Sequence, residues 1–250
     1  SKIIVYEAPL TNAGGIDVLQ KIADDNRAKQ VSISWGLGEN QTDAPSLNAE
    51  NASLMQMAMQ GQSCFIASGD SGAYTDGATL STADPASQPF ATAVGGTTLS
   101  VTRPGGSYAS ETTWADPTPD ARSSFGSGGG GGISKIWPLP DYQRGVGLST
   151  TQRNVPDVSL DADPNTGYAI YYAGQWFPVG GTSVAAPLWA AFAALANQQR
   201  VKNGQAVLGF ANPLIYEIGN SKNYAAGFHD IADNSTNLYY HATTGYDNAT

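Results

Sequence analysis

The stretch Val179-Gly-Gly-Thr-Ser-Val-Ala-Ala-Pro-Leu-Trp-Ala-Ala-Phe-Ala-Ala-Leu-Ala196 narrows the fold of this 250-residue chain more than any other. Glycines lead into Thr182-Ser183, and the apolar run that follows predicts a long helix, buried on nearly every face, with Pro187 in its first turn. A serine at a helix N-terminus lies beside unpaired N–H groups and the positive end of the helix dipole. A backbone N–H there stabilises a developing oxyanion, so the position favours a nucleophile. The alternative is that Ser183 only caps a core helix.

Upstream of this helix, strands and helices alternate. Residues 16–29 and 47–60 have helical patterns, and each is followed by a short apolar strand, at 30–35 and 63–67. This alternation predicts a parallel sheet with helical crossovers. Functional groups collect beyond the carboxyl ends of such strands. The segments 34–36 (Ser-Trp-Gly) and 68–72 (Ser-Gly-Asp-Ser-Gly) stand at these ends.

Two other segments carry expectations about structure. Residues 2–7 read as a buried strand that starts almost at the first residue, so we expect further sequence upstream of it. Residues 123–132 end in five consecutive glycines, which predicts a solvent-exposed loop or, alternatively, a backbone strip that pairs with a peptide substrate.

Composition excludes several classes of protein. A length of 250 residues suits one large α/β domain. The net charge of −9 argues against nucleic-acid binding, and no apolar run is long enough to span a membrane. Charged residues are only 13% of the chain, which suits a protein that works at harsh pH because few paired charges are lost on protonation. The single Cys64 rules out an internal disulfide and reads as a buried structural thiol.

The segment Gly-Thr-Ser-x-x-x-Pro resembles the nucleophile segment shared by subtilisins and sedolisins. A subtilisin needs a catalytic histidine upstream of the serine, whereas the only histidines, His229 and His241, lie downstream. Sedolisins (serine-carboxyl peptidases) use carboxylic acids instead. The chain is similar to them in short segments that are spread over nearly its whole length: 31–36, 68–72, 93–98, 155–158, 229–231 and 245–247.

This resemblance implies a subtilisin-like α/β fold, a mostly parallel sheet flanked by helices on both faces, and a secreted, acid-active serine endopeptidase acting on proteins or peptides. It assigns Ser183 as the nucleophile. Asp70 falls on the aspartate of the oxyanion hole, which donates a hydrogen bond while it keeps its proton. Ser34, Trp35 and Gly36 fall on the substrate cleft. The alternative for Trp35 is that it only packs in the core, and the alternative for Asp70 is that it only starts a turn.

The sedolisin Glu-x-x-x-Asp pair, which supplies the general base, precedes the segment that begins here at Lys2. Glu39-Asn-Gln-Thr-Asp43 has the same spacing but lies in a polar loop segment, and we do not expect it to substitute. Residues 1–250 are therefore expected to be the larger C-terminal part of one peptidase domain, with an N-terminal segment of the same precursor as its partner. The rivals are a non-catalytic peptide-binding or structural homologue that has lost its base, and a subtilisin-type protease.

The C-terminal segment resembles the calcium site of the same family. Two carboxylates and three backbone carbonyls would give the all-oxygen coordination that Ca²⁺ prefers. These ligands would come from Asp230, Ile231, Thr243, Gly245 and Asp247. The family pattern has glycine where this chain has Thr243, which keeps the carbonyl but changes the backbone freedom. The alternative is a surface turn with two solvated aspartates.

Overall fold

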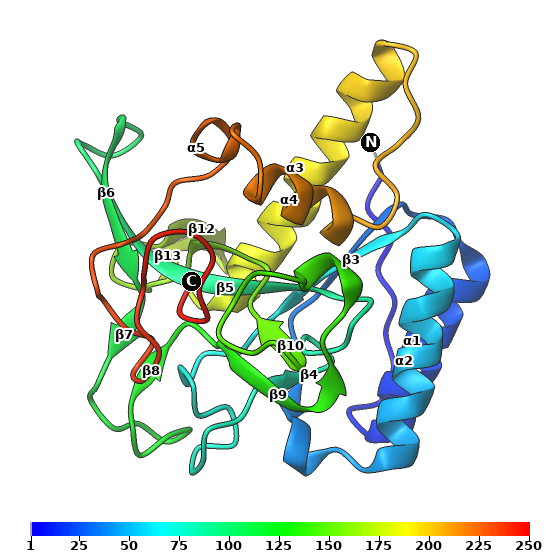
Figure 1. Ribbon diagram of the computed structural model, residues 1–250, viewed down its shortest axis with the longest axis horizontal. Coiled ribbons are helices and arrows are strands. Elements are labelled where there is room, and N and C mark those ends of the chain that lie inside the picture. Colours follow the sequence, from blue (N-terminus) through cyan, green and yellow to red (C-terminus); the bar gives the residue numbers. More distant parts are fainter. Residues whose placement is uncertain (1) are drawn as a thin grey trace.

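The computed structural model describes residues 2–250, in which a central sheet is covered by helices on both faces (Figure 1). The helices are α1 (Asn12–Asp25), α2 (Ala44–Met59), α3 (Thr182–Lys202), α4 (Asn212–Gly219) and α5 (Tyr224–Gly227), with 3-10 helices η1 (Glu39–Gln41) and η2 (Asp141–Gln143). The strands are β1 (Gln30–Ile33), β2 (Leu37–Gly38), β3 (Ser63–Ala67), β4 (Ala83–Asp84), β5 (Thr92–Val101), β6 (Tyr108–Thr113), β7 (Ala115–Asp116), β8 (Ser127–Gly128), β9 (Gly132–Pro138), β10 (Gln152–Val155), β11 (Val158–Asp161), β12 (Tyr168–Tyr172) and β13 (Gln175–Val179).

The central sheet has the order β1-β3-β5-β11, and all three pairings are parallel. Strand β6 adds an antiparallel partner to the far end of β5. The predicted parallel sheet and both predicted helices are confirmed, although the helices start earlier than the apolar pattern suggested. Helix α1 begins at Asn12 because the Thr11 hydroxyl accepts the Gly14 N–H at 3.1 Å, and α2 is capped in the same way by Asp43.

The two faces of the sheet have separate cores. On β3, Cys64 and Ile66 pack into the cluster formed with α1 and α2, whereas Phe65 and Ala67 pack against α3. This division follows from the twofold alternation of side chains along a strand. Cys64 is buried, as predicted, and burial raises the pKa of its thiol.

Helix α3 packs on the sheet through small residues. Ala185, Ala186, Ala190 and Ala193 face the strands and let the helix approach closely. The expectation that α3 is buried on nearly every face is wrong, because Phe192 on its other face is 60% exposed. Alanine dominates this helix and carries little directional information, so sequence alone could not separate its two faces.

The predicted strand at residues 2–7 and the predicted exposed loop at the glycine tract are also wrong. Residues 2–7 form no strand, and Ile3 is 90% exposed, since no neighbouring strand in residues 2–250 pairs with them. The glycines at 129–132 are buried rather than exposed. A Cβ on Gly129 would lie 2.6 Å from the Gly96 carbonyl oxygen, and one on Gly130 would collide with that of Ser68. These glycines let their backbone pack closely against Gly96 and against Ser68, which lies just before Asp70.

Within residues 2–250, no helix is both long and apolar enough to cross a membrane.

Candidate active site

The structure brings Ser183 and Asp70 to the same end of the sheet. Ser183 is the second residue of α3 and is exposed, while Asp70 follows the carboxyl end of β3. The Thr182 N–H and Thr182 hydroxyl both donate to Asp70 Oδ1, at 2.8 and 3.0 Å. Asp70, the carboxyl predicted for the oxyanion hole, therefore binds Thr182, the residue directly before the predicted nucleophile Ser183.

Glycine is required immediately before this turn. Gly181 has φ of +88°, in the region that other residues rarely adopt, and it is the N-cap of α3. A Cβ at Gly181 would lie 2.9 Å from Asp70 Oδ2, so any side chain would push the carboxyl away. Thr182 strengthens the junction further, since its hydroxyl also accepts the Gly69 N–H at 3.1 Å. Sequence analysis did not give Thr182 this role, although it lies within the Gly-Thr-Ser motif.

Pro187 links the nucleophile to the proposed cleft. It lies in the second turn of α3, not the first as predicted. Proline has no N–H, so the carbonyl of Ser183, four residues earlier, lacks its usual helical partner. The Ser34 hydroxyl donates to this carbonyl at 2.9 Å, which ties the end of β1 to the start of α3. The spacing of serine and proline in the motif thus creates an acceptor that Ser34 uses.

A basic residue faces the same carboxyl. Arg122 Nη1 lies 3.4 Å from Asp70 Oδ2, and Arg122 Nη2 lies 3.5 Å from Asp120 Oδ2. The guanidinium is exposed, so water screens the pair and its contribution to stability is at most about 1 kcal/mol. The contact places a positive charge 3.4 Å from the carboxyl that is predicted to donate a hydrogen bond in the oxyanion hole. Arg122 was not predicted as a site residue, because nothing in the loop sequence marks it as a neighbour of residue 70.

The predicted cleft segment lies beside a cavity of about 730 Å³. Trp35 and Gly36 line it, and Trp35 is partly exposed rather than enclosed in the core. Beyond Gly36, β2 pairs with β4, so this side of the cavity is a short two-stranded ribbon. A wall formed by this ribbon and an exposed indole ring suits contact with an extended peptide.

Glu39 and Asp43, which share the spacing of the sedolisin pair, do different work. Glu39 is buried and accepts the Lys135 N–H at 2.9 Å, whereas Asp43 caps α2 by accepting from Ser46. The Ser46 N–H and hydroxyl lower the pKa of Asp43. Neither carboxyl has a hydrogen bond to Ser183 in the described residues.

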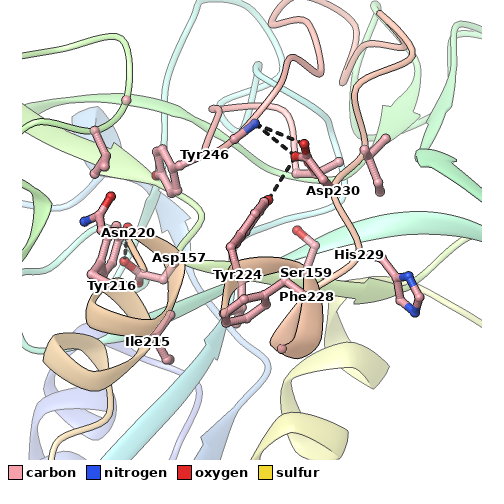
Figure 2. A pocket seen from close by; sticks show the side chains of 18 of the residues that line it. Asp157, Ser159, Ile215, Tyr216, Asn220, Tyr224, Phe228, His229, Asp230 and Tyr246 are labelled. Atoms are coloured by element: carbon pink, nitrogen blue, oxygen red, sulfur yellow. Dashed lines mark hydrogen bonds between the residues drawn. The ribbon is translucent and has the colours of Figure 1, made fainter. Parts of the chain in front are cut away.

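The residues predicted to bind calcium come from two C-terminal segments, 230–231 and 243–247, and Figure 2 shows Asp230 of the first segment at a pocket. Asp230, Ile231 and Gly245 line a cavity of about 530 Å³. Asp230 Oδ1 accepts the Gly245 N–H at 3.0 Å and the Tyr224 hydroxyl at 2.9 Å, as the dashed lines in Figure 2 show.

Asp247 is less available. Its Oδ2 accepts the Thr243 N–H at 2.8 Å, and its Oδ1 accepts the Ala249 and Thr250 N–H groups. Across residues 2–250, no cluster of three or more His, Cys, Asp or Glu side chains is arranged to hold a metal. The oxygen donors suit Ca²⁺, with Asp230 better placed to bind it than Asp247.

The two histidines lie outside the Ser183 site, as expected. His229 stacks on Tyr108 with 4.2 Å between ring centroids, and the exposed His241 lies 3.3 Å from the Asn234 carbonyl. Neither has a hydrogen bond to Ser183 or Asp70 within the described part of the chain.

An exposed serine at a glycine-led helix N-terminus, preceded by a threonine that binds a carboxyl group at the end of a parallel strand, indicates a class of serine hydrolases rather than one protein. The profile of the Subtilase family matches residues 1–208, and the chain belongs to that family.

Within it the chain groups with the sedolisins. It is 37% identical over 267 residues to kumamolisin of Bacillus sp. (strain MN-32) and 34% identical over 247 residues to sedolisin of Pseudomonas sp. (strain 101). These alignments cover 100% and 94% of this chain but only 45% and 40% of the relatives, so the chain spans less than half of their length.

Solved structures agree with this grouping. The structure of Pseudomonas sedolisin, a serine-carboxyl proteinase complexed with two molecules of pseudo-iodotyrostatin, superposes with a TM-score of 0.84 at 33% identity. The match covers 96% of this chain and 66% of that one. Sphericase, with a TM-score of 0.55 at 16% identity, shares the fold alone. The predicted subtilisin-like fold is confirmed.

Proposed function

We propose that the protein is a secreted, acid-active serine endopeptidase that hydrolyses peptide bonds through an acyl-enzyme on Ser183. The observation that carries the proposal is the junction at the head of α3, where Thr182 binds Asp70 at 2.8 Å and leaves Ser183 exposed beside it. The low share of charged residues, 13%, supports work at acid pH. The relatives named serine-carboxyl proteinase support the reaction class.

In the proposed acylation, Ser183 Oγ attacks the carbonyl carbon of the scissile bond while its proton passes to a glutamate carboxylate. The carbonyl oxygen becomes an oxyanion that accepts hydrogen bonds from the Ser183 N–H and from protonated Asp70. The intermediate collapses, the C–N bond breaks, and the amine leaves with a proton returned by the glutamic acid. Water then hydrolyses the ester by the same steps and frees Ser183.

The general base is proposed to come from outside residues 1–250, on an N-terminal segment of the same precursor. The 1–250 chain is then the larger C-terminal part of one catalytic domain. Support comes from the uses already made of Glu39 and Asp43, which bind Lys135 and Ser46. Substrate contacts are proposed for Ser34, Trp35 and Gly36, of which Trp35 and Gly36 line the 730 Å³ cavity.

A calcium ion is proposed at Asp230 and Asp247, with the carbonyls of Ile231, Thr243 and Gly245. Its role would be to hold the C-terminal loop on the domain, since the Asp230 carboxylate already bonds Gly245 at 3.0 Å. The Gly245 N–H and Tyr224 hydroxyl bond Asp230 Oδ1 at 3.0 and 2.9 Å, whereas Oδ2 has only the longer contact of 3.3 Å with the Gly245 N–H, so Oδ2 is the oxygen proposed to bind the ion.

The test is peptide hydrolysis by the complete protein and its Ser183→Ala variant. The parent should cleave a denatured protein with a bell-shaped pH profile on the acid side, because the glutamate must be ionised while Asp70 must be protonated. Ser183→Ala should reduce turnover about 10⁴–10⁶-fold with an unchanged melting temperature. An inactive parent that still binds peptide would support the non-catalytic rival, and retained turnover in the variant would exclude Ser183.

A further inference from the structure

Two buried carboxyl groups that the proposed chemistry does not use lie at the cavity beside the predicted cleft segment. Glu50, on the inner face of α2, is 4% exposed, and Asp84, at the end of β4, is 3% exposed. Carboxylates are rarely buried so completely unless they are paired. Glu50 and Asp84 both line the 730 Å³ cavity with Trp35 and Gly36.

Both carboxyls accept a hydrogen bond from one amide. Gln88 Nε2 donates to Asp84 Oδ1 at 2.8 Å and to Glu50 Oε2 at 3.3 Å. Two buried carboxyls that share one donor lie close together, and a proton on one of them relieves their repulsion. Two buried carboxyls that share one proton are stable, whereas two ionised ones repel each other.

The pair is in direct contact with the cleft segment. Asp84 pairs with Leu37 in the β2–β4 ribbon, and a Cβ on Gly36 would collide with the Asp84 carbonyl oxygen. On the other side, a Cβ on Gly15 of α1 would lie 3.2 Å from the Trp35 ring and 3.9 Å from Glu50 Oε1. The indole ring and the Glu50 carboxyl therefore border the same point of α1.

The charged groups that act on the pair are themselves acidic. Asp43, at the N-cap of α2, acts on Glu50, and Glu39, in η1, acts on Asp84. Burial first, and then the hydrogen bond to Asp84, raise the pKa of Glu50 to about 9. Burial also raises the pKa of Asp84, while its bonds from Glu50 and Gln88 oppose the rise. Glu50 is accordingly the group that keeps the proton.

We infer that Glu50 and Asp84 are positioning residues for the proposed peptidase: a proton-sharing pair that fixes the Trp35–Gly36–Leu37 wall of the cleft and holds it only while one carboxyl is protonated. The inference rests on the proposed function for its effect on substrate, but not for its effect on folding. It concerns binding rather than bond cleavage, since neither side chain has a hydrogen bond to Ser183 in residues 2–250.

The first test separates binding from chemistry. In the complete protein at pH 5, Glu50→Ala should raise KM about tenfold and leave kcat within about twofold, because a distorted wall weakens ground state and transition state alike. Glu50→Gln, whose amide still donates to Asp84, should restore KM. Glu217→Ala, which removes an exposed glutamate of α4, is the matched control. If Glu50→Ala does not fold, Glu50→Asp replaces it, since it withdraws the carboxyl by one CH₂ group.

The second test needs no activity. The folded protein keeps the Glu50 proton up to about pH 9, whereas an unfolded glutamate loses it near its ordinary pKa of 4.5. The stabilisation is therefore complete below pH 4.5 and is lost as pH rises toward 9, by up to tenfold in the folding equilibrium constant per pH unit. The melting temperature of the parent should fall more steeply between pH 5 and 8 than that of Glu50→Gln.

The outcomes are distinguishable. An unchanged KM in folded Glu50→Ala overturns the positioning role, and equal pH slopes for parent and Glu50→Gln overturn the shared proton. If the parent hydrolyses nothing, the proposed function fails. The pH slopes of the melting temperature then still test whether Glu50 and Asp84 share a proton. Calorimetric binding of the same peptide replaces KM as the test of whether the pair fixes the cleft wall.

Discussion

Arg153→Met should destabilise the folded protein strongly, because it leaves the Asp157 carboxylate buried without its counter-ion. Both side chains are 0% exposed, and the pair is bidentate, with Nη1 to Oδ1 at 2.8 Å and Nη2 to Oδ2 at 2.6 Å. Asp157 also accepts the Ala93 N–H at 2.7 Å and the Tyr216 hydroxyl at 2.9 Å. The pair thus joins β10, β5, β11 and α4.

The expected magnitude follows from this geometry. Removing one partner of a fully buried pair costs about 3–5 kcal/mol, which is a large part of a total stability of roughly 5–15 kcal/mol. For a domain of this size the melting temperature should fall by roughly 6–20 °C. In Arg153→Met/Asp157→Asn no buried charge remains, so the double variant should recover about 1 kcal/mol or more relative to additive effects. Arg144→Met removes an exposed pair with Asp141 and should cost less than about 1 kcal/mol.

Urea unfolding of the complete protein at constant calcium and pH 5 measures these differences. The parent, the single variants Arg153→Met, Asp157→Asn and Arg144→Met, and the double variant are compared by midpoint at a common slope, and circular dichroism before unfolding verifies that each variant is folded. A cost for Arg153→Met no larger than that for Arg144→Met would refute the reasoning. So would strict additivity in the double variant, because the two charges would then not be coupled.

At the active site, Asp70→Ala should lower kcat about 10²–10³-fold. Asp70→Asn should keep more activity and flatten the alkaline limb of the pH profile, because its amide donates a hydrogen bond at any pH. An unchanged alkaline limb in Asp70→Asn would argue against the oxyanion role of Asp70. Chelation should lower the melting temperature of the parent but not of Asp230→Ala, and calorimetry that detects no calcium binding would reject the ion.

The sequence predicted the central sheet well because its pattern is local. Strands such as β3 are short apolar runs between helices, and the rule for parallel sheets then placed Asp70 at a strand end. The same reasoning failed for residues 2–7, since an apolar run does not reveal whether a partner strand exists. In the structure Ile3 is almost fully exposed.

The parts of the site that escaped prediction depend on contacts between distant residues. Arg122 is 52 positions from Asp70, and no local pattern connects them. Glu50 lies on a helix where a carboxylate usually faces solvent, so its burial against Asp84 could not be inferred. The glycine tract misled for a different reason: composition suggests flexibility, whereas Gly129 and Gly130 are there because a Cβ would not fit.

The most direct test of the central claim is the mass of the Ser183 peptide during turnover. The complete protein is mixed with a peptide ester at acid pH, quenched within milliseconds, digested and examined by mass spectrometry. An acyl group should appear on the fragment that contains Ser183, decay as product forms, and be absent from Ser183→Ala. Continued turnover with no adduct on that fragment, or an adduct on another residue, would contradict the account.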